Sequence, residues 1–259
     1  MIFWDVHESG RPDAPTVLLS SGLGGTASYW APQLAALQAR YRVIAYDQAG
    51  TGRNKRDLPD DHSIAAMADE ALAVLDATRT DQAHFVGHAL GGLVGLDLAT
   101  RHPQRLRSLT VVNGWAAAHA HTRRCFDVRL TLLRDSGPRA YVHAQPLFLF
   151  PPEWNSARTE ELLAEEEVHL AHFPGVEMMQ RRIAAARLFN AADRLSEVTV
   201  PTLCIASEDD MLVPPHCSIE LAKAVSGAQC ITMRGGHACN VTQPKEFNDL
   251  VQQWVYGEN

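Results

Sequence analysis

Short apolar runs alternate with amphipathic stretches along the first half of the chain. Four apolar runs have the length and content of buried strands, at 16–19, 41–46, 84–86 and 109–112. Between them, apolar residues of the segment 64–75 recur at helical spacing, and residues 90–99 form another amphipathic stretch. This alternation predicts a parallel sheet with right-handed crossovers, so we expect an α/β protein.

The pattern changes after Trp115, where helical signals begin to dominate and no convincing buried strand follows until about residue 199. Strand-like runs return at 202–206 and 230–233, and a last helix is expected from about 245 to 255. A sheet interrupted in this way indicates one domain with an insertion. The expected division is an α/β core at 1–115 and 199–259, and a helical lid at 116–198.

Composition narrows the class of function. The 259 residues are 46% hydrophobic and 20% charged, and the formal net charge is −7. The chain can bury a large core, and its acidic balance argues against a nucleic-acid partner. No apolar run approaches the ~18 residues of a membrane span, and residues 1–8 lack the basic region of a signal peptide. We therefore expect a soluble, cytoplasmic protein with no membrane partner.

The cysteines fit the same compartment. Five are present, an odd number without short pair spacing: Cys125, Cys204, Cys217, Cys230 and Cys239. Reduced cytosolic thiols are expected for this arrangement, and a buried, inert thiol is expected at Cys239. Because no Cys-x-x-Cys or His-Glu-x-x-His pattern occurs, we expect neither a metal nor a cofactor.

The segment Gly87-His88-Ala89-Leu90-Gly91 stands between a predicted strand and a predicted helix. Its glycines and its position resemble the Gly-x-Ser-x-Gly nucleophile elbow, in which the central serine attacks the substrate. Here Ala89 occupies the nucleophile position, and a methyl group cannot attack a carbonyl. Leu90 begins a helix, so its N–H is free to donate to a developing oxyanion.

Three more segments with catalytic potential follow predicted strands, where ligands bind in open α/β sheets. Ser21-Gly22-Leu23-Gly24-Gly25 lets the backbone approach a ligand, although alone it also fits an ordinary glycine turn. Asp210 and His237 each lie on a loop after a late strand. Along the chain the nucleophile position comes first, the acid second and the base third, which is the order of a hydrolase triad.

On these motifs the chain resembles the α/β-hydrolase superfamily over nearly its whole length. The resemblance implies a mostly parallel sheet flanked by helices, with an inserted helical lid. It also implies that Asp210 is the acid, His237 the base, and the N–H groups of Leu23 and Leu90 the oxyanion hole. Ala89 is the main departure from the family pattern.

A closer resemblance, over residues 14–255, is to the pyrimidine-utilisation D family. The segments that carry it are 21–25, 28–30, 46–48, 87–91, 121–126, 145–149 and 236–242. The family acts in the ring-opening breakdown of uracil and thymine. The resemblance therefore implies hydrolysis of carbamate or 3-aminoacrylate with release of ammonia, and an alanine that is natural at position 89.

Without a serine there can be no acyl-enzyme, so we expect His237, oriented by Asp210, to activate water directly. Both implied substrates are small anions, and a cation is expected beside them. Arg123 and Arg124 in the lid are the candidates, although exposed arginines are common. Trp115 is expected to wall the pocket, with core packing as its alternative role.

Two other functions remain open from the sequence. The chain could be a degenerate hydrolase that binds a ligand or a partner without catalysis, although a pure binder has no need of an acid and a base. It could also be a cofactor-free lyase or oxygenase that works through the histidine. The sequence leaves the oligomeric state open, with a homodimer among the expected assemblies.

Overall fold

The computed structural model describes residues 2–11 and 13–257. In this part of the chain, seven strands form one sheet in the order β1-β3-β2-β4-β5-β6-β7. The strands are β1 (Phe3–His7), β2 (Thr16–Ser20), β3 (Arg42–Asp47), β4 (Ala83–His88), β5 (Leu106–Val112), β6 (Thr202–Ser207) and β7 (Gln229–Met233). β1 pairs antiparallel with β3, and every other pairing is parallel. The α/β class expected from the sequence is confirmed.

The helices follow the strands. Those of the core are α1 (Ala31–Gln38), α2 (Ile64–Ala77), α3 (Leu90–Arg101), α9 (Pro215–Ala224), α10 (Cys239–Thr242) and α11 (Pro244–Gly257). Those between β5 and β6 are α4 (Ala120–Thr131), α5 (Gly137–Leu149), α6 (Pro152–Ala157), α7 (Thr159–Ala171) and α8 (Val176–Leu188). Shorter helical turns are η1 (Ala27–Trp30), η2 (Pro103–Arg105), η3 (Leu132–Ser136) and η4 (Ala192–Glu197).

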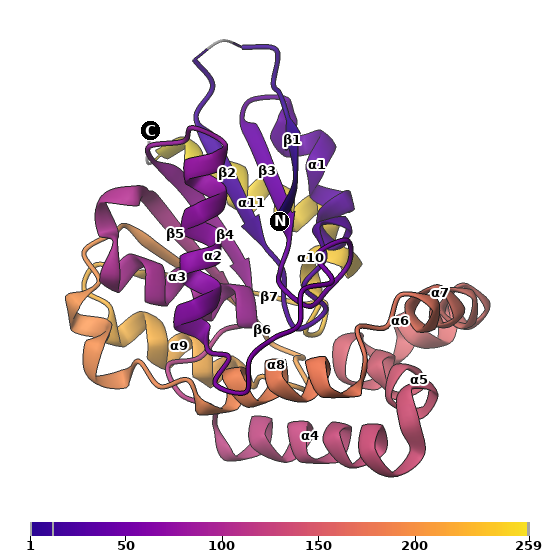
Figure 1. Cartoon of the computed structure of the whole chain (residues 1–259). Coiled ribbons are helices and arrows are strands. Elements are labelled where there is room, and N and C mark those ends of the chain that lie inside the picture. Colours follow the sequence, from indigo (N-terminus) through magenta and orange to yellow (C-terminus); the bar gives the residue numbers. More distant parts are fainter. Residues whose placement is uncertain (1, 12, 258–259) are drawn as a thin grey trace.

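The alternation of side chains along the central strands divides the core into two layers. Leu18 and Phe85 point to the face covered by α2 and α3, while Val17, Leu19 and Val86 point to the face covered by α1 and α11. Both faces of these strands are therefore buried, as expected for a parallel sheet with helices on each side. Figure 1 shows α2 and α3 in front of the sheet and α11 behind it.

The parallel strands all end at one edge of the sheet, and the helices between β5 and β6 lie over that edge (Figure 1). α8 lies between the sheet and α4, whereas α6 and α7 project to one side. The loops that carry the candidate chemistry follow β2, β4, β6 and β7 at this edge. The fold thus places segments far apart in sequence beneath one helical cover.

Candidate active site

The turn at Ala89 has the backbone of a nucleophile elbow. Ala89 adopts φ 48° and ψ −113° between β4 and α3, a conformation that strains any residue with a side chain. A Cβ on Gly91 would lie 2.1 Å from the carbonyl oxygen of Ser20, and one on Gly87 would lie 2.3 Å from that of Gly91. Only glycine fits at both positions, so the tight strand-to-helix turn depends on these two residues.

The expected oxyanion donors lie on both sides of this turn. Leu90 is the first residue of α3, and Leu23 lies on the loop that follows β2. Across the described residues, neither N–H donates to another group of the protein. The loop of Leu23 lies against the elbow, because a Cβ on Gly22 would be 2.8 Å from Nδ1 of His88. Both N–H groups are therefore available to a ligand, as an oxyanion hole requires.

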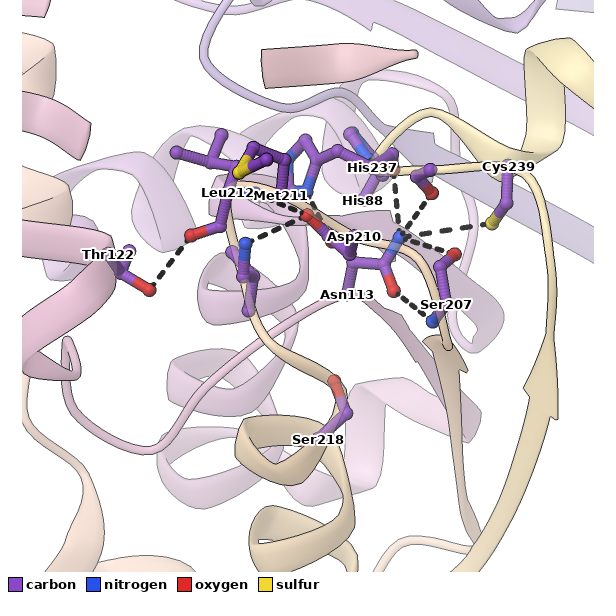
Figure 2. Close-up of polar contacts among 12 residues, drawn as sticks. His88, Asn113, Thr122, Ser207, Asp210, Met211, Leu212, Ser218, His237 and Cys239 are labelled. Carbon is purple, nitrogen blue, oxygen red and sulfur yellow. Dashed lines mark hydrogen bonds and ion pairs between the residues drawn. The ribbon is translucent and has the colours of Figure 1, made fainter. Parts of the chain in front are cut away.

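Asp210 and His237 form a buried pair. Nδ1 of His237 donates to Oδ2 of Asp210 at 2.7 Å, and the two side chains are 3% and 0% exposed respectively (Figure 2). The other carboxylate oxygen of Asp210 accepts the backbone N–H groups of Leu212 (2.7 Å) and Val213 (2.8 Å). These contacts fix the carboxylate and hold the Nδ1–H tautomer of the imidazole. The remaining ring nitrogen, Nε2, is then the one that can accept a proton.

The backbone of His237 is held by two side chains that the sequence did not indicate for this role. Its carbonyl oxygen accepts hydrogen bonds from Nε2 of His88 and from Nδ2 of Asn113, each at 2.8 Å (Figure 2). Asn113, with φ 50°, also joins Ser207, whose N–H donates to its Oδ1 at 2.8 Å. His237 is therefore fixed to the ends of β4, β5 and β6.

His88 itself stays neutral. Burial, reinforced by the nearby His237, lowers the pKa of His88 to about 3. Its ring stacks on Tyr29 with centroids 5.1 Å apart, and Tyr29 in turn donates to Asn240 at 2.7 Å. Since Nε2 carries the single proton, Nδ1 of His88 is an acceptor, and it is buried without a partner among the described residues.

An arginine of α8 holds the loop after β2 on which Leu23 lies. Arg182 of α8 is fully buried and donates to the carbonyl oxygens of Leu23 (3.0 Å), Ala49 (3.2 Å) and Gly22 (3.4 Å) and to the side chain of Gln48. Burial lowers the pKa of Arg182 to about 10. Because it bonds the carbonyls on either side of the Leu23 N–H, α8 helps to fix where that donor points.

The three lid and pocket residues expected to contact the substrate lie at different depths. Arg123 and Arg124 are exposed on α4, and Nε of Arg123 donates to the carbonyl oxygen of Ala118 at 2.9 Å. Trp115 is 2% exposed, and its ring meets that of Phe126 edge-on at 6.3 Å. Nε1 of Trp115 is buried without an acceptor within the described ranges, so it could still donate to a ligand.

Two other side chains near the site, the Cys239 thiol and the Ser21 hydroxyl, are not activated as nucleophiles. Burial raises the pKa of the Cys239 thiol to about 12, so it is not a thiolate near neutral pH. The hydroxyl of Ser21 donates to the carbonyl oxygen of Thr26 at 2.6 Å. In the part of the chain that the structure describes, no three potential metal ligands gather together. The helices there are also too short or too polar to cross a membrane.

Comparison with known proteins gives a consistent result. A family model described as "alpha/beta hydrolase fold" matches residues 15–141. A protein of Rhizobium rhizogenes named "Putative carbamate hydrolase RutD" is 47% identical over 97% of both chains, and one of the same name from Caulobacter sp. is 48% identical over 99% of this chain and 96% of its own. Among solved structures, the enol-lactonase of Burkholderia xenovorans superposes with a TM-score of 0.90 at 25% identity, covering 98% of this chain and 96% of its own.

Proposed function

Because this chain belongs to the RutD family within the α/β hydrolases, we propose that it releases ammonia from carbamate or 3-aminoacrylate by adding water. The proposal includes a place in the breakdown of uracil and thymine, and a cytoplasmic location for the enzyme. The observation that carries it is the 2.7 Å contact between His237 and Asp210 beside an elbow whose central residue is alanine. An acid and a base are retained where the nucleophile is absent.

In the proposed reaction His237 acts on water rather than on a serine. Nε2 takes a proton from a water molecule as its oxygen bonds to the carbamate carbon, and Asp210 stabilises the imidazolium that results. The N–H groups of Leu23 and Leu90 stabilise the negative charge on the substrate oxygen. The C–N bond then breaks, nitrogen receives the proton from His237, and ammonia and bicarbonate leave.

With 3-aminoacrylate the products would be ammonia and malonic semialdehyde, and the proton transfers differ. His237 takes a proton from water as the water oxygen bonds to the carbon that bears nitrogen, and the neighbouring carbon receives that proton. The new hydroxyl group then gives its proton to nitrogen as the C=O bond forms, the C–N bond breaks and ammonia leaves. Carbamate decomposes unaided in water, and an active site stripped of its nucleophile retains about 10³–10⁴-fold acceleration in a serine protease. A labile substrate is therefore compatible with a site that lacks a nucleophile.

The test is ammonia release above the uncatalysed rate, from carbamate and from 3-aminoacrylate generated in place. We expect His237→Ala to lower the catalysed rate by about 10²–10⁴-fold, because the general base is lost. His169→Ala, an exposed histidine of α7, is the matched control and should behave as the unmodified protein does. Oxygen consumption is recorded in the same reactions.

The outcomes separate the three functions. Release that exceeds background and is lost with His237→Ala supports water activation, and the faster substrate identifies the reaction. Release equal to background in every variant contradicts hydrolysis and favours a binding protein. Oxygen consumption that depends on His237 would instead indicate a cofactor-free oxygenase.

A further inference from the structure

The lid contains a second buried arginine, Arg129 of α4, which is 4% exposed. Its Nη2 donates to the hydroxyl of Tyr141 at 2.9 Å and to Oε1 of Gln145 at 2.6 Å. The guanidinium carbon also lies 5.3 Å from the ring centroid of Tyr141, and 5.7 Å from those of Phe126 and Phe148. Helices α4 and α5 thus enclose one cation in an aromatic cage.

The charge of this cation is not neutralised by the protein. Across residues 2–11 and 13–257, no carboxylate oxygen lies within 4.0 Å of the Arg129 side chain, although most other lid arginines have such a partner. Its Nε is buried and donates to no acceptor in the same residues. A buried charge and a buried donor are both costly when left unpaired. Arg129 is therefore equipped for an anion that the protein itself does not supply.

Arg182 provides the contrast. It is equally buried and equally without a carboxylate partner, yet three carbonyl oxygens and an amide oxygen receive its hydrogen bonds. Its donors serve the loop around Leu23. Of the two buried lid arginines, only Arg129 has a side-chain nitrogen that is buried without an acceptor among the described residues, and Arg123 and Arg124 are exposed.

Arg129 also shares a helix face with residues that contact the candidate site. Thr122 and Arg129 are seven residues apart on α4, hence on one side of the helix, and the hydroxyl of Thr122 donates to the carbonyl oxygen of Leu212 at 3.0 Å (Figure 2). Phe126, between them, meets the ring of Trp115. The Asp210 loop and Trp115 therefore lie against the same face of α4 as Arg129.

The end of α5, which forms one side of the cage, contacts the loop that carries His237. Phe148, which lies against the Arg129 guanidinium, precedes Leu149, and the Leu149 carbonyl oxygen accepts the N–H of Ala238 at 3.0 Å. Ala238 directly follows His237. The cage is thus built from the two lid helices that touch the acid loop and the base loop.

We propose that Arg129 is the residue that binds the carboxylate or carbamate group of the substrate. Tyr141 and Gln145 orient the guanidinium through Nη2, and Nε donates to the anion. The aromatic rings exclude water around the ion pair, which strengthens it. This inference rests on the proposed function for the identity of the anion, and it replaces the exposed Arg123 and Arg124 by a buried cation.

The experiment uses binding without turnover. Propanoate is titrated into the full chain and followed by protein NMR, with propanamide as the uncharged probe of the same shape. We expect propanoate to bind at least about tenfold more tightly than propanamide, because a hydrogen bond to a charged group contributes more than one to a neutral group. Arg129→Gln should abolish that preference, Arg129→Lys should keep part of it, and Arg124→Gln should leave it intact.

The NMR spectrum shows whether each variant folds. If Arg129→Gln does not fold, Arg129→Lys still tests the proposal, because lysine keeps the positive charge but lacks the planar guanidinium group. Equal affinity for the two probes in the unmodified protein overturns the proposal. So does a preference that survives Arg129→Gln, or one that Arg124→Gln removes. Because no ammonia is formed, a loss of propanoate preference in Arg129→Gln supports this site even where the hydrolysis assay fails. Conversely, hydrolysis that depends on His237 but is unaffected in KM by Arg129→Gln contradicts this site alone.

Discussion

At the scale of single residues, Ala89 keeps a strained backbone without the hydroxyl for which such a turn is ordinarily used. Its φ of 48° and ψ of −113° are accessible to glycine at little steric cost. A side chain there costs of order 1–3 kcal/mol. The turn is nevertheless tightly packed, because a Cβ at Gly87 or Gly91 would lie 2.3 Å or 2.1 Å from a neighbouring backbone oxygen.

We therefore expect Ala89→Gly to raise the free energy of unfolding by about 1 kcal/mol, the relief of strain exceeding the greater entropy of the unfolded chain. The measurement is urea denaturation followed by circular dichroism. Ala73→Gly in the interior of α2 is the matched control. It should lower stability by about 1 kcal/mol, because helical φ and ψ favour alanine. A loss of stability in both variants would contradict strain at Ala89.

The site residues divide into those that the sequence could indicate and those that need the fold. His237, Asp210, Leu23 and Leu90 were expected because short motifs follow predicted strands. The contacts of Asn113 and Arg182 at the site, and the role proposed for Arg129, were not expected, since each depends on contacts with residues elsewhere in the chain. The only local signal was the spacing of three between Phe126 and Arg129, which places an aromatic ring and a cation on one helix face.

At the scale of elements, the six strand runs expected from the sequence all fall on strands of the sheet, and the periodic segment 64–75 lies within α2. β1 was missed. Its residues are all half-buried, and it pairs antiparallel with β3 at the edge of the sheet. Asp5 of this strand also forms an ion pair with Arg53 at 2.7 Å. A half-buried edge strand that carries an acid lacks the apolar run by which the buried strands were identified.

The helix α8 illustrates what periodicity cannot reveal. Arg182 lies on its buried face, where an apolar residue would be expected, and bonds the loop after β2. We expect Arg182→Met to lower the free energy of unfolding by roughly 3–5 kcal/mol, because several buried acceptors lose their donor at once. Thermal unfolding monitored by circular dichroism measures the loss.

The matched control is Arg187→Met on the same helix. Arg187 contacts Asp127 at 2.8 Å, and both side chains are partly exposed, so the change should be under about 1 kcal/mol. Equal losses in the two variants would mean that Arg182 contributes no more than a surface ion pair does.

At the scale of the whole molecule, buried neutral histidines couple stability to pH. Burial lowers the pKa of His88 to about 3 and that of His62 to about 4. In the unfolded chain both regain a pKa near 6.5, so the unfolded state binds more protons below that pH. Stability is therefore full above about pH 6.5 and falls as the pH drops toward the folded-state pKa values.

The substitution His88→Gln should remove the contribution of His88 to the pH dependence of the free energy of unfolding. The glutamine amide can still donate to the His237 carbonyl oxygen, but it does not titrate. Between pH 7 and pH 5 the free energy of unfolding should fall by roughly 2 kcal/mol less than in the unmodified protein. Urea titrations at the two pH values provide the comparison, and the exposed His169→Gln serves as control. Parallel pH dependence in His88→Gln and the unmodified protein would show that His88 is not held neutral by the fold.

Hydrogen bonds join the lid helices to the core from α8, through Arg181 and Arg182, and from α4, through His121 and Thr122. At the end of α5 the carbonyl oxygen of Leu149 accepts the N–H of Ala238. By contrast, within the described chain the hydrogen bonds and ion pairs of residues 152–171 stay inside the lid, and Gly175 follows with φ 99°. The lid is therefore joined to the core through α4, α5 and α8, whereas α6 and α7 form their hydrogen bonds and ion pairs with the other lid helices. A change in α6 or α7 would accordingly leave in place the hydrogen bond of Arg182 to the loop after β2.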